Sequence, residues 1–168
     1  MYEKKGYVKF DSTRKYRYLL RRKWNENLPQ VTFVMLNPSK ANEYEDDHTL
    51  TRCISFTKSW KKYGSLEVVN LFAHCATDPD ELFQVDNPVG IKNDCYIQVA
   101  TKRADLIILA WGASEYLKKN RGREEKVLSL ISGQQPLHCL KLTKEGYPNH
   151  PVRLPNNLKP IIFPNSSL

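Results

Sequence analysis

Two kinds of segment alternate along this chain, and their hydrophobic patterns differ. Residues 31–36 form a continuous apolar run, which is typical of a strand covered on both faces. Three further segments rich in apolar residues are predicted as strands: residues 66–72, 105–111 and 137–142. Between them, apolar positions recur at helical spacing, first in a segment capped by Thr49 or Thr51 and stopped by Gly64, then over residues 88–103 and 123–131. Residues 15–24 mix apolar and basic side chains in near alternation, which predicts a half-exposed strand or hairpin arm.

Strands that alternate with helices predict a parallel sheet with helices on both faces. The expected fold class is therefore α/β, a three-layer sandwich with a central four-stranded parallel sheet and an additional N-terminal strand or hairpin. No linker or internal repeat divides the chain, so residues 1–168 are expected to form one domain. The last loop, residues 144–155, is rich in Gly and Pro.

Composition narrows the class of protein. Hydrophobic residues make up 40% of the chain, which is typical of a folded globular protein. No apolar run reaches the roughly 20 residues needed to cross a bilayer, and the N-terminus lacks the apolar core of a signal peptide. We therefore expect a cytoplasmic protein with no membrane association. The four cysteines are scattered without C-x-x-C spacing, so no metal site is expected.

The chain is basic, with a net charge of +8, and many of its basic residues lie in the first 23 positions. Neutralisation of phosphates supplies most non-specific affinity for nucleic acids, so a polyanionic partner is a reasonable inference. A basic domain without such a partner fits the same charge.

Polar residues follow the predicted strands at their carboxyl ends, where open α/β sheets bind ligands. These ends are Asn37-Pro38-Ser39, Asn70-Leu71-Phe72, Trp111-Gly112 and the loop with Asn149-His150-Pro151. Neither G-x-G-x-x-G nor G-x-x-x-x-G-K-[ST] is present, so no nucleotide cofactor is expected. G-x-S-x-G is absent too, which argues against a hydrolase nucleophile. An asparagine amide can read the edge of a nucleobase, an aromatic ring can stack on the base, and a histidine can stabilise an oxyanion.

Six stretches over nearly the whole chain carry a family resemblance. They are R-Y-L-L-R-R-K-W, M-L-N-P-S-K-A, D-D-H-T-L-T-R-C, V-V-N-L-F-A, A-W-G and P-N-H-P. In these stretches the chain resembles a bacterial and phage family of unassigned function, the DUF1643 proteins. Three shorter motifs, the strand ends at Asn37-Pro38 and Asn70 and the later His150-Pro151, are similar in order to motifs of the uracil-DNA glycosylase superfamily. The mismatch-specific branch, which includes thymine-DNA glycosylase, is the most similar because it also has Asn at the first motif.

The glycosylase resemblance implies a role for each matching residue. Asn37 would position the attacking water, His150 would stabilise the anionic base oxygen, and Asp46 or Asp47 would supply a carboxylate. Asn70 would read the flipped base, with Phe72, Pro38 and Ser39 around it. The DNA contacts assigned to basic side chains are Lys40, Arg52, Arg121, Arg123 and Arg153.

The function expected from this resemblance is a monofunctional DNA glycosylase without lyase activity. It would flip a modified pyrimidine out of DNA and hydrolyse its N-glycosidic bond, in a setting such as defence against phages with hypermodified DNA. We expect DNA as the partner, no cofactor and a monomer. Two alternatives stay open: a non-catalytic nucleic-acid-binding protein, and an N-glycosidase that acts on free nucleosides or nucleotides.

Overall fold

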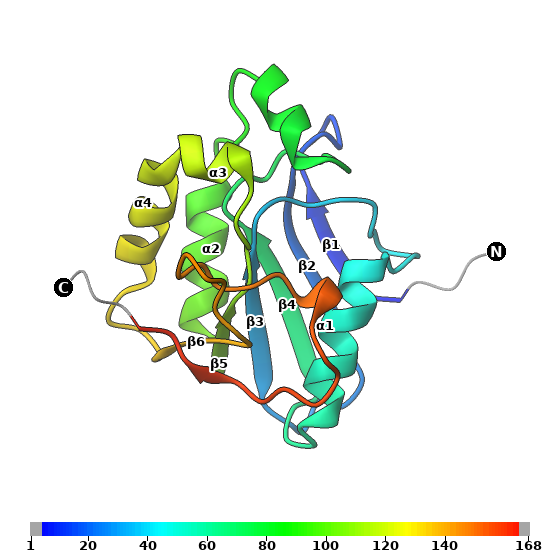
Figure 1. The fold of residues 1–168 in the computed structure, drawn as a ribbon. Coiled ribbons are helices and arrows are strands. Elements are labelled where there is room, and N and C mark those ends of the chain that lie inside the picture. The colour runs from blue at the N-terminus through cyan, green and yellow to red at the C-terminus, as the bar shows by residue number, and fades with distance from the viewer. Residues whose placement is uncertain (1–4, 165–168) are drawn as a thin grey trace.

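The computed structural model describes residues 5–164 (Figure 1). In this part of the chain, seven strands form one sheet in the order β1-β2-β4-β3-β5-β6-β7. The strands are β1 (Tyr7–Phe10), β2 (Arg17–Lys23), β3 (Gln30–Met35), β4 (Ser65–Asn70), β5 (Leu106–Leu109), β6 (Leu137–Cys139) and β7 (Ile161–Ile162). The helices are α1 (His48–Ser59), α2 (Asn93–Lys102), α3 (Glu115–Lys119) and α4 (Arg121–Ile131), with 3-10 turns η1 (Pro79–Gln84) and η2 (Pro151–Arg153).

The sheet is mixed. β3 pairs in parallel with both β4 and β5, and β5 pairs in parallel with β6. The pairs β1–β2, β2–β4 and β6–β7 are antiparallel. The predicted α/β class is confirmed, and β1 with β2 forms an N-terminal hairpin. The sheet is wider than expected because antiparallel strands extend it on both sides.

Side chains of the central strands point alternately to the two faces of the sheet, as strand geometry requires. On β3, Val34 packs with Ile97 of α2 and Val127 of α4 in one apolar cluster. The neighbouring Phe33 belongs to a second cluster, which contains Phe56 of α1. The sheet therefore carries α1 on one face and α2 with α4 on the other (Figure 1).

Two helix starts differ from the sequence prediction. The N-cap of α1 is Asp47 rather than Thr49 or Thr51, because its carboxylate accepts a hydrogen bond from the backbone N–H of Leu50 at 2.8 Å. α2 begins at Asn93 rather than at residue 88, after a turn in which Gly90 has φ +89°. Such a backbone is costly for any residue but glycine, so the turn at Gly90 delays the start of the helix.

The sequence pattern did not predict four short elements: β1, β7, η1 and α3. Each has two to six residues, too few for a hydrophobic period to show. Over residues 5–164, no helix combines the length and the apolar character required to span a membrane.

Candidate functional site

A pocket of about 260 Å³ lies where β3 and β4 end and α1 begins. Its polar lining comes from segments far apart in the sequence: Arg17, Asn37, Ser39, Asp47, Thr49, Asn70, Thr77 and His150. The apolar floor includes Met35, Val68 and Leu50. The structure thus brings the two predicted strand-end residues, Asn37 and Asn70, and the predicted loop residue His150 to one cavity.

Asn70 is the last residue of β4 and points to the same face of the sheet as Val68. It is only 1% exposed. Neither its side-chain oxygen nor its side-chain nitrogen has a hydrogen-bond partner among the described residues. An unsatisfied buried polar group costs about 1–3 kcal/mol, which makes this amide a candidate to pair with a group bound in the pocket.

Asn37 follows β3, and its amide has a fixed orientation. The Nδ2 atom donates to the carbonyl of Ala76 at 2.8 Å and to that of Pro38 at 3.1 Å. Two carbonyls around one NH₂ group assign that end of the amide as the nitrogen. The Oδ1 atom is thereby left as an acceptor at the pocket lining.

His150 directly precedes η2, and one hydrogen bond sets its tautomer. The backbone N–H of Val152 donates to Nδ1 at 3.2 Å, so a neutral ring carries its proton on Nε2. Burial lowers the pKa of His150 below its ordinary value, against a smaller opposing effect of Asp47 and with a further lowering by His48. The neutral ring therefore lines the pocket as a hydrogen-bond donor through Nε2.

Gly112 supports the loop that carries His150. It has φ +73°, and its N–H donates to the carbonyl of Pro148 at 2.8 Å. A Cβ atom at this position would lie 3.4 Å from the Cβ atom of His150. The backbone conformation therefore favours glycine, whereas the added Cβ atom would make an ordinary van der Waals contact with His150.

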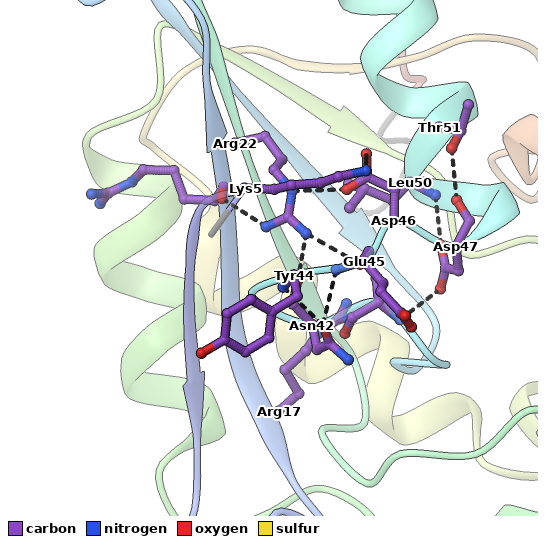
Figure 2. Close-up of polar contacts among 12 residues, drawn as sticks. Lys5, Arg17, Arg22, Asn42, Tyr44, Glu45, Asp46, Asp47, Leu50 and Thr51 are labelled. Carbon is purple, nitrogen blue, oxygen red and sulfur yellow. Dashed lines mark hydrogen bonds and ion pairs between the residues drawn. The ribbon is translucent and has the colours of Figure 1, made fainter. Parts of the chain in front are cut away.

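The adjacent acidic residues Asp46 and Asp47 have different partners, as Figure 2 shows. Asp46 forms ion pairs with Arg22 at 2.9 Å and with Lys5 at 3.7 Å, and it does not line the pocket. Asp47 does line the pocket, and its two oxygens accept from the N–H groups of Leu50 and Ala41. Asp47 is therefore the better placed of the two for the predicted carboxylate role.

Arg17, at the start of β2, is a lining residue that sequence reasoning did not select. It is 4% exposed, and Nη1 donates to the carbonyl of Ala41 at 3.0 Å. Burial is the largest influence on its guanidinium and lowers the pKa to about 10. In the sequence it is one of many basic residues near the N-terminus, and no local signal separates it from them.

Several predicted site residues lie away from the pocket. Phe72 packs in the core, edge to face with Tyr116 at 4.9 Å. Arg123 is buried, donates to the carbonyl of Leu71 at 2.7 Å and pairs with Asp94 at 2.7 Å, so it stabilises the fold. Arg52 donates to the carbonyl of Leu154.

The remaining predicted site residues away from the polar lining are Pro38, Lys40, Arg121 and Arg153. Pro38 is buried beside the pocket, where its carbonyl accepts from the N–H of Ala76 at 2.9 Å. Lys40, Arg121 and Arg153 are exposed. The DNA contacts of the five basic residues and the stacking role of Phe72 stay predictions.

The structure thus defines an α/β protein with a small polar pocket at the carboxyl ends of the interior strands β3 and β4. Residues 17–152 match the model of a family described as "Protein of unknown function (DUF1643)", and the chain belongs to this family. No curated protein and no solved structure matches the chain. The predicted family is confirmed, and the likeness to uracil-DNA glycosylases stays a prediction.

Proposed function

We propose that this protein is a DNA glycosylase that takes a single flipped base, a modified pyrimidine, into the pocket and hydrolyses its bond to the sugar. The observation that carries the proposal is the buried, unpartnered amide of Asn70. An amide offers an acceptor and donors side by side, which matches the edge of a nucleobase. At about 260 Å³ the pocket is smaller than the roughly 300–1,000 Å³ of sites for drug-sized ligands, which favours one ring over a whole nucleotide.

The lining residues supply the parts of a hydrolytic mechanism. The Nε2–H of His150 donates to a base oxygen, and Oδ1 of Asn37 accepts a hydrogen bond from the attacking water. The bond between sugar C1′ and the base nitrogen breaks, and its electron pair leaves with the base. The water oxygen bonds to C1′ and releases a proton to solvent. The carboxylate of Asp47 stabilises the positive charge that develops on the sugar.

DNA as the substrate is supported by charge around the lining residues. Lys40 follows the lining residue Ser39, Arg153 lies three residues after His150, and both are exposed. The whole chain carries +8. Contacts to phosphates provide the affinity that offsets the few kcal/mol needed to flip a base.

A second candidate is a nucleic-acid-binding protein that holds a flipped base without cleaving it. Asn37 favours it, because an amide is no general base, and its own donors are occupied by backbone carbonyls. The carboxylate of Asp47 is likewise bound to two backbone N–H groups.

The two candidates separate in one experiment. Duplex and single-stranded DNA containing uracil or phage-type modified pyrimidines is incubated with the protein. Released bases are identified by mass spectrometry, and abasic sites by alkaline cleavage. We expect base release that falls strongly in Asn37→Ala and His150→Gln. It should be unchanged in the control His138→Gln, because His138 lies on β6 outside the pocket and its ring contacts the carbonyl of Pro136. Salt-dependent binding without base release on any substrate would establish the binding protein instead.

A further inference from the structure

Arg17 is placed beside the group that recognises the base. β2 runs antiparallel to β4, so the start of β2 lies next to the carboxyl end of β4. The backbone N–H of Arg17 donates to the carbonyl of Ala73 at 2.9 Å, just past that end. Its side chain lines the same pocket as Asn70 and His150.

The guanidinium of Arg17 lacks the partner that other buried arginines have. Arg22 pairs with Asp46 at 2.9 Å and Arg123 pairs with Asp94 at 2.7 Å. Arg17 forms no ion pair with any residue between 5 and 164, and its Nε has no hydrogen-bond acceptor there. A buried charge is retained at a cost unless a counter-charge is supplied.

The charged and titratable groups that act on Arg17 do not replace that partner. They are Cys75, Asp47, Arg22 and Cys53. Asp47 lines the same pocket and raises the pKa of Arg17 through space, but it forms no ion pair with Arg17 in the described structure. Burial raises the pKa of the Cys53 and Cys75 thiols, so both stay uncharged at neutral pH. Arg17 remains a cation at neutral pH, because its pKa of about 10 lies well above 7.

We propose that Arg17 is the counter-ion for negative charge on the group bound in the pocket, and that in the reaction this charge is that of the departing base. The inference rests on the proposed function. When the bond to C1′ breaks, the electron pair stays on the base, which becomes an anion until it takes up a proton. A fixed, water-excluded cation at this position stabilises that anion more than the neutral base, which lowers the barrier.

The rest of the pocket explains why such a cation is needed. His150 is neutral and contributes a hydrogen bond without a full positive charge. Asn37 activates water only weakly, because it cannot remove a proton. A reaction with a weak nucleophile depends on stabilising the leaving group, and Arg17 is the lining residue that does so with a full charge.

Binding of two free pyrimidines tests this charge preference without requiring any cleavage. Barbiturate is an anionic ring at neutral pH, and uracil is a neutral ring of similar shape. We expect the wild-type protein to bind barbiturate at least about tenfold tighter than uracil in calorimetric titrations. Arg17→Met, uncharged and of similar length, loses this preference, and Arg17→Lys keeps part of it. Arg14→Met, a change at an exposed arginine outside the pocket, keeps all of it. Equal binding of the two rings by the wild-type protein would overturn the proposal, whether or not the Met variant folds.

Base release gives an independent arm of the test. Removing one stabilising donor from an anion site costs about 10²- to 10³-fold in kcat, and we expect a loss of this size in Arg17→Met with a smaller change in KM. Base release with unchanged kcat in Arg17→Met overturns the role of Arg17 and leaves the glycosylase intact. A barbiturate preference that depends on Arg17, without base release from any DNA, supports the counter-ion and overturns the glycosylase.

Discussion

The side-chain amide of Asn93 donates hydrogen bonds to the backbone carbonyls of Asn70 at 2.9 Å and Leu71 at 3.2 Å. Asn93 is fully buried at the start of α2. It therefore fixes the strand end that carries the pocket amide, from the face of the sheet opposite to α1. In Asn93 only Oδ1 lacks a partner, because Nδ2 donates to both carbonyls, whereas in Asn70 neither side-chain atom has a partner in the described chain.

Asn93→Ala is expected to destabilise the protein and to loosen the pocket. It removes the donor to two buried carbonyls, and the free energy of unfolding should fall by about 1–3 kcal/mol in urea titrations. Affinity for the base should fall with it. Asn120→Ala is the control, because Asn120 also donates to a carbonyl, that of Tyr116, but away from the pocket. Equal base affinity in the two variants would contradict the positioning role of Asn93.

Asn70→Leu is expected to have the opposite effect on stability. The change replaces an unsatisfied buried amide by an apolar side chain of similar size, so the free energy of unfolding should rise by up to about 1–3 kcal/mol. Base binding and release should be lost. Chemical denaturation measures the gain in the free energy of unfolding, and the release assay measures the loss of activity. A destabilised Asn70→Leu variant would show that the amide has a structural role in the free protein.

The lowered pKa of His150 predicts a pH dependence of stability. Above pH 6.5 the ring is neutral in both the folded and the unfolded chain. As pH falls through 6.5, the unfolded chain binds a proton that the folded state still excludes, so stability is lost toward the lower folded pKa. Denaturant titrations from about pH 8 to about pH 5 measure the loss. His150→Gln should flatten this part of the profile, and the control His138→Gln should leave it in place. An unchanged profile in His150→Gln would contradict the assignment.

Gly112→Ala should impair catalysis beyond its effect on stability. Gly112 and Gly133 both have positive φ, +73° and +80°, so alanine at either position costs roughly 1–2 kcal/mol. Only at Gly112 does the strained backbone hold the loop of His150, because its N–H donates to the carbonyl of Pro148; its new Cβ would lie 3.4 Å from His150, whereas a Cβ at Gly133 meets nothing within 4 Å. Gly133→Ala is thus a matched control for backbone strain. Base release should fall in Gly112→Ala alone; equal rates in both variants would show that the backbone at Gly112 does not position His150.

Variants of Asp47 should distinguish its role as the N-cap of α1 from the role of its negative charge in base release. Asp47→Ala removes the N-cap of α1 and should cost about 0.5–2 kcal/mol of unfolding free energy. Asp47→Asn keeps the capping oxygen but loses the acceptor for the N–H of Ala41, so it should cost less stability than Asp47→Ala, yet lose base release if the carboxylate stabilises the sugar cation. Full activity of Asp47→Asn would restrict Asp47 to its structural role.

Local pattern was sufficient to predict the main strands and the presence of three helices. The apolar runs at β3 and β5 and the stripe on α1 are long enough to show their period. Helix starts were less predictable, since Asp47, Thr49 and Thr51 are all good caps in sequence and only the conformation of the loop decides among them. β7 has two residues and is stabilised by pairing with β6, a contact made between distant parts of the chain.

The sequence by itself determined the α/β class, the family and the positions of Asn37, Asn70 and His150 at the ends of predicted elements. Only the tertiary structure decided which of the basic and acidic residues belong to the pocket. Arg17, Arg22 and Arg123 are the same residue type in the sequence. In the structure Arg17 lines the cavity without an ion pair among the described residues, whereas Arg22 and Arg123 form buried ion pairs. Burial and pairing depend on what the folded chain places around a charge, and that information is absent from local sequence pattern.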